Sequence, residues 1–350
     1  MQDTKAGHSL ADRLAAGPVI CAEGYLFELE RRGYVRAGAF VPEVVLEHPE
    51  EVEALHREFV HAGSDVVEAF TYYAHREKLR QLGKEDQLEP MNRQALEIAG
   101  TVARETGTLL AGNICNTNAW DPHDESAQAG VRRMFAEQVG WAAEAGVDLV
   151  IGETISFAGE ALAALAAIKD AGLPAVVTIG IHQEPRTMEG WTPLEACQRL
   201  FDAGADVVGL NCHRGPRTML PLLDELVTGV SVPVAALPVP YRTTPTQPTF
   251  QSLRDPGYDR YPDGRPFPTG LDPFTCTRYE VADFTAAAAD MGVRWFGLCC
   301  GGAPHHVRAM AETLGRKPAA SRYHEDMSQH AYFGAEQTVR AGNRALAEQL

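Results

Sequence analysis

Short apolar runs rich in β-branched residues recur eight times along the chain, and most of them are followed by a longer stretch with helical spacing. These runs cover residues 18–24, 64–70, 108–114, 147–154, 174–180, 205–212, 232–238 and 293–300. Their apolar residues are consecutive rather than alternating, which is typical of strands buried on both faces of a parallel sheet. Eight strands alternating with helices predict a (β/α)8 TIM barrel rather than an open doubly wound sheet.

The stretches between the strands have the hydrophobic spacing of helices. Apolar residues recur every three or four positions in the segments 48–63, 91–107, 129–146 and 158–172. Five strands follow a similar helix ending, which reads HAGSD, EAGVD, DAGLP, DAGAD or DMGVR. We expect the glycine of this ending to adopt a left-handed conformation that stops the helix. The helical periodicity indicates core packing and no function.

Two segments interrupt the alternation of strands and helices. Residues 239–275 are rich in proline and form a long loop before the eighth strand, where aromatic residues favour ordered packing over the barrel mouth. After Gly315 the barrel pattern ends, and residues 335–350 have the pattern of one amphipathic helix. We therefore divide the chain into a barrel, 1–315, and a helical tail, 316–350. The tail can pack on its own barrel or on a neighbouring subunit, and we expect a homo-oligomer.

Composition and charge narrow the class of protein. The chain has 45% hydrophobic and 22% charged residues, which is typical of a soluble globular protein. No signal-peptide pattern and no stretch near 18 consecutive apolar residues occur, so we expect neither export nor a membrane span. The net charge of −16 argues against nucleic acid, which binds basic surfaces. Seven cysteines without an export signal indicate the cytoplasm, where they are thiols or metal ligands.

Two adjacent cysteines occur in the stretch FGLCCGG, residues 296–302. Neighbouring side chains of a strand point to opposite faces, so packing does not explain the pair. The sixth strand ends in Cys212 and the eighth in Cys299 and Cys300, and the chemistry of a TIM barrel lies at these strand ends. The two glycines after the pair permit a turn that brings both sulfurs inward. Three thiolates meeting there suit Zn²⁺, a borderline-soft ion.

Three protein ligands leave one tetrahedral position of zinc open, which is typical of a catalytic site. A substrate thiol that bound at this position would lose its proton at neutral pH. The spacing alone leaves a vicinal disulfide, or simple burial, of Cys299 and Cys300 as alternatives. The function of Cys115 stays open. Three other cysteines are interpreted as small buried hydrophobic residues: Cys21, Cys197 and Cys276.

Longer motifs surround these cysteines. GLNCHRGP (209–216) and GVRWFGLCCGGAPHHVRAM (292–310) resemble the two cysteine motifs of the zinc-dependent homocysteine S-methyltransferase family. The resemblance is close to the betaine–homocysteine branch, and it extends through LFELERRGYVRAG (26–38) and PVPYRTTP (238–245). It covers nearly the whole chain up to about residue 315. It implies a TIM barrel and methyl transfer from an onium donor to a thiol, which gives methionine in the best-known members.

The resemblance also implies site residues. It implies that zinc is held by three sulfurs: Cys212, Cys299 and Cys300. Glu153, at the end of the fourth strand, corresponds to the carboxylate that binds the ammonium group of the amino acid. Tyr73 corresponds to a tyrosine near the metal that helps to bind the donor, and Tyr73 and Glu153 are the candidate catalytic residues. Phe40 stands where the betaine enzymes have a tryptophan, and it can offer an aromatic face to a quaternary ammonium. We also place Asn211, next to the metal ligand, among the substrate-binding residues.

Both substrate pockets differ from the family pattern. The first strand of the family ends in Asp-Gly-Gly or a similar sequence around the amino acid, whereas this chain has Ala22, Glu23 and Gly24. A glycine whose backbone would approach the substrate is therefore replaced by a bulky acid. Ala69 stands where a threonine is expected, and Thr154 replaces a second donor-binding tyrosine. The resemblance thus implies an intact metal site and altered substrate pockets.

Three functional hypotheses remain. The leading one is a zinc-dependent S-methyltransferase that moves a methyl group from a betaine-like or sulfonium donor to a zinc-activated thiol, with homocysteine and methionine as the default pair. The altered pockets make a different donor or thiol the main alternative. A lyase or hydrolase with zinc-activated water is disfavoured, because three thiolates make zinc a poor Lewis acid. A zinc-containing protein that captures thiols or betaines without turnover is the non-enzymatic alternative.

Overall fold

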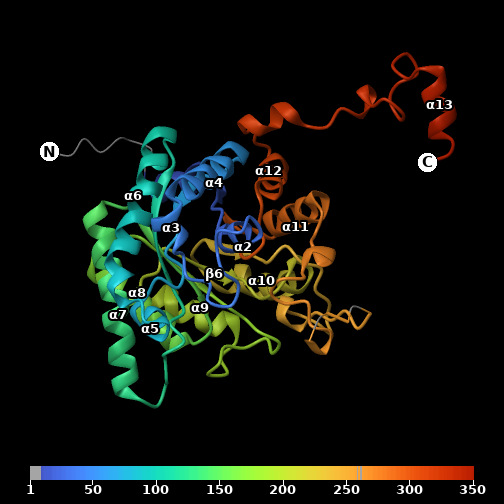
Figure 1. The fold of residues 1–350 in the computed structure, drawn as a ribbon. Helices are drawn as coiled ribbons and strands as arrows, with labels where there is room; N and C mark the ends of the chain where they lie inside the picture. Colours follow the sequence, from blue (N-terminus) through green and yellow to red (C-terminus); the bar gives the residue numbers. More distant parts are fainter. Residues whose placement is uncertain (1–8, 258, 261) are drawn as a thin grey trace.

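A ring of eight parallel strands forms the centre of the computed structural model, which describes residues 9–257, 259–260 and 262–350 (Figure 1). The strands are β1 (Val19–Ile20), β2 (Val66–Glu68), β3 (Leu109–Cys115), β4 (Leu149–Ile155), β5 (Ala175–Ile179), β6 (Val207–Asn211), β7 (Val234–Leu237) and β8 (Trp295–Phe296). Their order is β1-β8-β7-β6-β5-β4-β3-β2. A parallel bridge between Cys21 and Val66 joins the two ends of this order. The predicted (β/α)8 TIM barrel is confirmed.

Strands β1 and β8 are shorter than their apolar runs. Each has two residues, and they pair with Val19 opposite Trp295 and Ile20 opposite Phe296. Gly297 follows β8 and lies so close to β1 that a Cβ atom would be 2.2 Å from the carbonyl oxygen of Cys21. The apolar runs continue beyond the strands because the turns that carry the site are also buried.

Most of the helices surround the ring on its outer side, whereas α13 lies apart from it (Figure 1). They are α1 (Leu10–Ala16), α2 (Tyr25–Arg31), α3 (Val44–Glu47), α4 (Pro49–Ala62), α5 (Arg76–Leu82), α6 (Leu88–Thr106), α7 (Glu125–Ala145), α8 (Ala158–Asp170), α9 (Pro193–Asp202), α10 (Pro216–Gly229), α11 (Arg278–Met291), α12 (Pro304–Thr313) and α13 (Ala341–Ala347). The four predicted helices correspond to α4, α6, α7 and α8. Helix α7 begins earlier than its apolar pattern because the Asp124 carboxylate accepts hydrogen bonds from the Ser126 and Ala127 amides.

The predicted glycine stops are confirmed. A positive φ is found at all five: Gly63, Gly146, Gly172, Gly204 and Gly292. Such a conformation is easily adopted only by glycine, so each of these residues ends its helix and directs the chain into the next strand.

Two apolar layers stabilise the barrel. Side chains of the strands fill its interior, with the fully buried indole of Trp295 as the largest. A second layer lies between the strands and the helices and includes Phe59 and Phe135. The site described below lies beyond the interior layer, at the carboxyl ends of the strands.

The long loop between β7 and α11 packs over the barrel mouth. It contains the short 3₁₀ segments η2 (Phe250–Ser252), η3 (Pro262–Gly264) and η4 (Asp272–Phe274). The Phe250 amide donates to the carbonyl oxygen of His213, 2.8 Å away, just after β6. The side chains of Tyr241 and Phe250 are buried and stacked, with ring centroids 5.8 Å apart. Phe267 packs edge-on against Phe250, with ring centroids 5.0 Å apart, so the expected ordered packing is confirmed for these three aromatic residues. The other two aromatics of this expectation, Tyr258 and Tyr261, lie outside the described residues.

The tail is less regular than its sequence pattern. After α12 it contains η5 (Ala319–Tyr323), η6 (Met327–Gln329) and α13, and its last part extends away from the barrel (Figure 1). The prediction of one helix over 335–350 is wrong in extent, because the helix covers only Ala341–Ala347. The preceding Thr338 and Val339 are β-branched and have lower helix propensity. None of the helices in the described ranges is long and apolar enough to span a membrane.

Candidate active site

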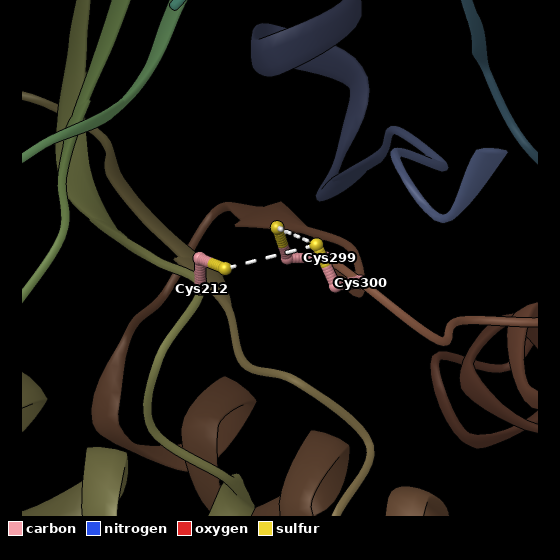
Figure 2. A group of neighbouring side chains, drawn as sticks. All are labelled: Cys212, Cys299 and Cys300. Carbon is pink, nitrogen blue, oxygen red and sulfur yellow. Dashed lines mark hydrogen bonds between the residues drawn. The ribbon is translucent and has the colours of Figure 1, made fainter. Parts of the chain in front are cut away.

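Three thiols from two separate strand ends meet at the barrel mouth. Cys212 directly follows β6, and Cys299 and Cys300 follow β8 (Figure 2). The Cys300 sulfur is 3.9 Å from each of the other two sulfurs, and all three lie within 4.8 Å of one another. A disulfide bond requires about 2.05 Å, so the structure contains the pair as free thiols. The convergence predicted from sequence is present.

The turn after β8 explains how adjacent cysteines direct both sulfurs to one place. The Cys299 amide donates to the carbonyl oxygen of Pro238, and the Gly302 amide donates back to the carbonyl oxygen of Cys299. Between them Gly301 has a φ of +95°, which a residue with a side chain rarely adopts. A Cβ atom there would lie 2.3 Å from the Tyr241 hydroxyl. The alternation of side chains between the two faces of β8 therefore ends before the cysteine pair. The turn that follows is the one expected from the two glycines.

Strained backbone conformations occur at several predicted site residues. Non-glycine residues with a positive φ in the described part of the chain include Phe40, Tyr73, Thr154, Cys212 and His213. Such conformations are unfavourable for residues with a Cβ atom, and they are frequent at active sites. Part of this strain lies at the carboxyl ends of strands, because Thr154 is in the last part of β4 and Cys212 and His213 directly follow β6.

The chemistry of the three sulfurs fits a thiolate-bound divalent ion. Four ligands at a zinc–sulfur distance of about 2.3 Å would be about 3.8 Å apart in a tetrahedron. The two 3.9 Å sulfur–sulfur distances agree with this spacing. Hydrogen bonds with Cys299 and Cys300 lower the pKa of Cys212 to about 5, and the hydrogen bond with Cys212 raises the pKa of each partner. One thiolate is thus already favoured, and a soft cation would stabilise the others.

Three buried carboxyl groups lie beside the sulfurs. They belong to Glu23, Glu68 and Glu153, at or near the ends of β1, β2 and β4. The Asn113 amide donates to both Glu68 and Glu153 over 2.7 Å, while neither carboxyl oxygen of Glu23 has a hydrogen-bond donor in the described chain. Burial and neighbouring carboxyls raise the pKa of Glu23 and Glu68, and burial with Cys299 raises the pKa of Glu153 to about 8. No lysine, arginine or histidine of the described chain lines the pocket that contains these carboxyl groups, so their neutral forms are favoured.

Asn211 holds the carboxyl group of Glu153 in place. Its amide nitrogen donates to Glu153 Oε2 over 3.1 Å and lies 2.9 Å from Thr154 Oγ1. Its amide oxygen accepts from the Thr154 backbone N–H over 2.8 Å. The amide therefore orients a residue beside the sulfurs, and it connects the end of β6 to the end of β4.

The structure brings only part of the predicted set into one small pocket. This pocket is lined by Glu23, Ala69, Glu153, Cys299 and Cys300 together with other buried residues. Gly24 does not line the pocket but packs against the backbone of Gly302, where a Cβ atom would be 2.2 Å from the Gly302 carbonyl oxygen. The remaining predicted residues that do not line it are Phe40, Tyr73, Thr154, Asn211 and Cys212.

The predicted donor-side aromatics lie outside this pocket. Phe40 stacks on Phe27 with ring centroids 5.6 Å apart. The Tyr73 hydroxyl accepts from the Asn118 side-chain amide over 3.3 Å, and Lys78 Nζ lies 4.9 Å from the centre of its ring. The Tyr73 ring thus already has a cation over one face.

Sequence reasoning missed Glu68, Tyr72 and Asn113, which also line the pocket. Glu68 and Asn113 carried a signal, since each is a polar residue in the last part of an otherwise apolar strand run. In a TIM barrel such a position points to the site. Tyr72 had no comparable signal, because it lies in an aromatic loop beside Tyr73.

Fold and site together define a TIM-barrel enzyme with a thiol cluster and a small pocket of buried carboxyl groups at the carboxyl ends of its strands. A family model described as homocysteine S-methyltransferase matches residues 20–314. Betaine–homocysteine S-methyltransferase 1 of Mus musculus is 36% identical over 329 residues, which cover 91% of this chain and 79% of that protein. The S-methylmethionine–homocysteine S-methyltransferase of Pongo abelii is 35% identical over 329 residues, which cover 91% and 87% of the two chains.

A solved structure has the same fold. The metallated homocysteine methyltransferase MmuM from Escherichia coli superposes with a TM-score of 0.66 at 18% identity, over 85% of this chain and 96% of that chain. The chain belongs to the homocysteine S-methyltransferase family, and it is a methyltransferase. The resemblance to this family is thereby confirmed.

Proposed function

We propose that the protein is a zinc-dependent S-methyltransferase of the cytoplasm, which transfers a methyl group from an onium donor to a thiol. The observation that carries the proposal is the meeting of the Cys212, Cys299 and Cys300 sulfurs within 4.8 Å. These three residues would hold the ion. When bound there, zinc would ligate the acceptor thiol and lower its pKa, so that the sulfur reacts as a thiolate.

The transfer itself needs little other chemistry from the protein. A new bond forms between the acceptor sulfur and the methyl carbon, the bond from that carbon to the onium nitrogen or sulfur breaks, and a neutral amine or sulfide leaves. The thiol proton is released before the transfer. The chain's contribution is to hold donor and acceptor in line, which is worth a large part of the barrier in such reactions.

Glu153 is the proposed ligand for the positive end of the acceptor. Its carboxyl group is buried and is oriented by Asn113 and Asn211. It lies beside Cys299, so an ammonium group bound to it would place the thiol of a short chain near the sulfurs. Homocysteine, the acceptor in the names of the relatives, has this arrangement of amine and thiol.

The onium donor is proposed to bind on the side of Tyr73 and Phe40. Quaternary ammonium and sulfonium groups are attracted to the faces of aromatic rings. The Lys78 ammonium lies over one face of the Tyr73 ring, so an onium donor bound on that face would have to replace it. The relatives are named for both kinds of donor, betaine and S-methylmethionine.

A donor and acceptor panel tests the proposal. Zinc-loaded protein is incubated with glycine betaine, S-methylmethionine or another sulfonium donor and with thiols that include homocysteine, and S-methyl products are measured by mass spectrometry. We expect an S-methyl product from at least one onium donor, lost on removal of zinc and restored on its return. Bound zinc without any S-methyl product would contradict the proposal and indicate a binding protein.

A further inference from the structure

Tyr72 lies where the small pocket of the site meets the barrel mouth. It lines this pocket together with Cys299, Cys300 and other side chains. Among the described residues of the lining, all except Tyr72 are buried, whereas Tyr72 is partly exposed. The side of the pocket that faces solvent is therefore formed by Tyr72.

The ring of Tyr72 has a free side, in contrast to the ring of Tyr73. The two rings pack against each other with centroids 4.5 Å apart. Tyr73 also has Lys78 Nζ 4.9 Å from its ring centre, so a second part of its surface is in use. In the described part of the chain no cation lies over the Tyr72 ring. Because the face of an aromatic ring attracts positive charge, the free side of Tyr72 suits a cationic ligand beside the cysteines.

The hydroxyl group of Tyr72 is held by the loop after β3. It donates to Asn116 Oδ1 over 3.2 Å, and the Asn116 side-chain amide donates to Asn118 Oδ1 over 3.0 Å. The Asn118 amide donates in turn to the Tyr73 hydroxyl, so the two tyrosines are joined by one hydrogen-bonded chain. Since the Tyr72 proton is used by Asn116, the lone pairs of its oxygen can face the positively charged methyl groups of an onium ligand.

We infer that Tyr72 contacts the onium donor and directs its methyl group toward the acceptor sulfur. The inference rests on the proposed methyl transfer, and it adds no bond to those formed and broken there. With the acceptor bound at the buried Glu153, the donor has to reach the acceptor sulfur from the side that faces solvent, where Tyr72 lies. The leaving group and the attacking sulfur lie on opposite sides of the methyl carbon, so a contact on the donor fixes the line of attack. Tyr72 thereby favours a cationic donor over a neutral molecule of the same shape.

Donor kinetics of two Tyr72 variants test the inference. Zinc-loaded protein is assayed with homocysteine and with the onium donor that gives product, such as glycine betaine or S-methylmethionine. Tyr72→Leu removes the ring and should raise the donor KM at least about ten-fold, while Tyr72→Phe removes only the oxygen and should raise it about two- to five-fold. The KM of homocysteine and the zinc content should stay within about two-fold. Tyr323→Phe, on the exposed η5, is the matched control and should keep all of these values.

Neutral analogues separate charge from shape. In 3,3-dimethylbutanoate a carbon atom replaces the nitrogen of glycine betaine, and 2-amino-5-methylhexanoate is the corresponding analogue of S-methylmethionine. The inhibition constant of the matching analogue should differ by less than about two-fold between wild type and Tyr72→Leu, because no positive charge faces the ring. A loss for the neutral analogue equal to the loss for the donor would overturn the inference.

The outcomes distinguish the inference from the proposed function. If S-methyl product forms and the donor KM is unchanged in Tyr72→Leu, the inference fails and the proposed function stands. The same holds if the KM values of donor and homocysteine rise equally, because Tyr72 would then act on the site as a whole. If no onium donor gives an S-methyl product, both fail.

Discussion

Cys212 shows how a single residue is oriented for its chemistry. Its φ of +60° is a left-handed conformation, which costs a residue with a side chain about 1–3 kcal/mol. Two backbone hydrogen bonds maintain it: the Cys212 amide donates to Leu237 over 2.9 Å, and the Arg214 amide donates to Cys212 over 2.6 Å. The backbone conformation thus directs the sulfur of Cys212 toward that of Cys300.

The ligand role of this cysteine leads to the first prediction. Cys212→Ala should lower bound zinc from about one to below about 0.1 ions per chain, because two thiolates hold the ion poorly. S-methyl transfer should become undetectable, while the far-UV circular dichroism spectrum is unchanged. Cys197→Ala is the control, since Cys197 is a fully buried thiol on α9 outside the cluster, and it should keep zinc and activity. Zinc content is measured by plasma mass spectrometry, and a zinc-replete Cys212→Ala protein would contradict the assignment.

The cysteines of the candidate site could be predicted from the sequence, because adjacent cysteines are rare. The polar residues beside them could not, because single polar residues in strands are common. Adjacent cysteines before two glycines are rare, so Cys299 and Cys300 could be recognised from their neighbours alone. Glu68 and Asn113 stand alone in apolar strands, and a linear pattern does not say that both reach the same pocket. Their hydrogen bond depends on the register between β2 and β3, which forms only in the closed sheet.

At the scale of elements, the turn after β8 connects the metal centre to the loop over the mouth. Gly301 packs against the hydroxyl of Tyr241. Tyr241 is fully buried and accepts a hydrogen bond from Arg31 Nη2 over 2.9 Å. The positions of the two adjacent cysteines are therefore fixed by contacts from the long loop and from α2.

A pair of glycine variants tests this connection. Gly301→Ala should lower the free energy of unfolding by more than about 2 kcal/mol, because backbone strain adds to a clash with Tyr241. It should also weaken zinc binding at least about ten-fold. Gly33→Ala is the matched control, since Gly33 also has a positive φ but has no atom near an added Cβ. It should cost about 1 kcal/mol and leave zinc affinity unchanged.

Urea unfolding and competition with a chelator measure the two quantities. If Gly301→Ala and Gly33→Ala lost the same stability and the same zinc affinity, the contact with Tyr241 would not hold the turn after β8 in place.

Helix α4 contains a histidine that makes stability depend on pH. His56 is buried, its ring packs edge-on against Tyr25, and neither ring nitrogen has a hydrogen-bond partner in the described chain. Burial lowers the pKa of His56 to about 3. The unfolded chain therefore binds a proton near pH 6.5 that the folded chain does not.

The resulting prediction concerns acid unfolding. The contribution of His56 is fully present above pH 6.5 and is lost as the pH falls toward 3, by at most about 1.4 kcal/mol per pH unit. His56→Leu should reduce the slope of stability against pH between 6 and 4 by about one proton. His61→Leu, an exposed position on the same helix, is the control and should keep the slope. Identical slopes in wild type and His56→Leu, from denaturant unfolding at each pH, would contradict this account.

The order of strands and helices was predictable because each element has its own local sequence pattern. The lengths of the elements were not predictable from these patterns. The eight apolar runs gave the barrel, and five glycine stops have the expected conformation. The runs at β1 and β8 were too long as strands because burial of the turns after them also requires apolar residues. The helix expected at 335–350 covers only Ala341–Ala347, because the β-branched Thr338 and Val339 before it have lower helix propensity.

At the scale of the whole molecule, the tail has two parts. Arg316 lies 2.5 Å from Asp65 and also donates to the carbonyl oxygen of Pro18, so the first part fastens to the barrel. The hydrogen bonds of residues 327–350 in the described chain all remain within 326–350. This second part exposes large apolar side chains: Met327, Tyr332, Phe333, Leu346 and Leu350.

An exposed apolar arm predicts association of copies. We expect the full chain to form a homo-oligomer through residues 327–350, because burial of these side chains against a second copy would be favourable. A chain that ends at Asp326 should be a monomer with unchanged zinc content. Size-exclusion chromatography with light scattering measures both masses. A monomeric full chain, or a truncated chain with the same oligomeric state, would contradict the prediction.

The central claim is that three cysteine sulfurs hold one zinc ion and leave a position for the acceptor thiol. X-ray absorption at the zinc K-edge of the full-length, zinc-loaded protein tests it most directly. The account predicts about three sulfur neighbours at about 2.3 Å, and a fourth when a thiol acceptor is added. A first shell made mainly of nitrogen or oxygen at about 2.0–2.1 Å, unchanged by added thiol, would contradict it.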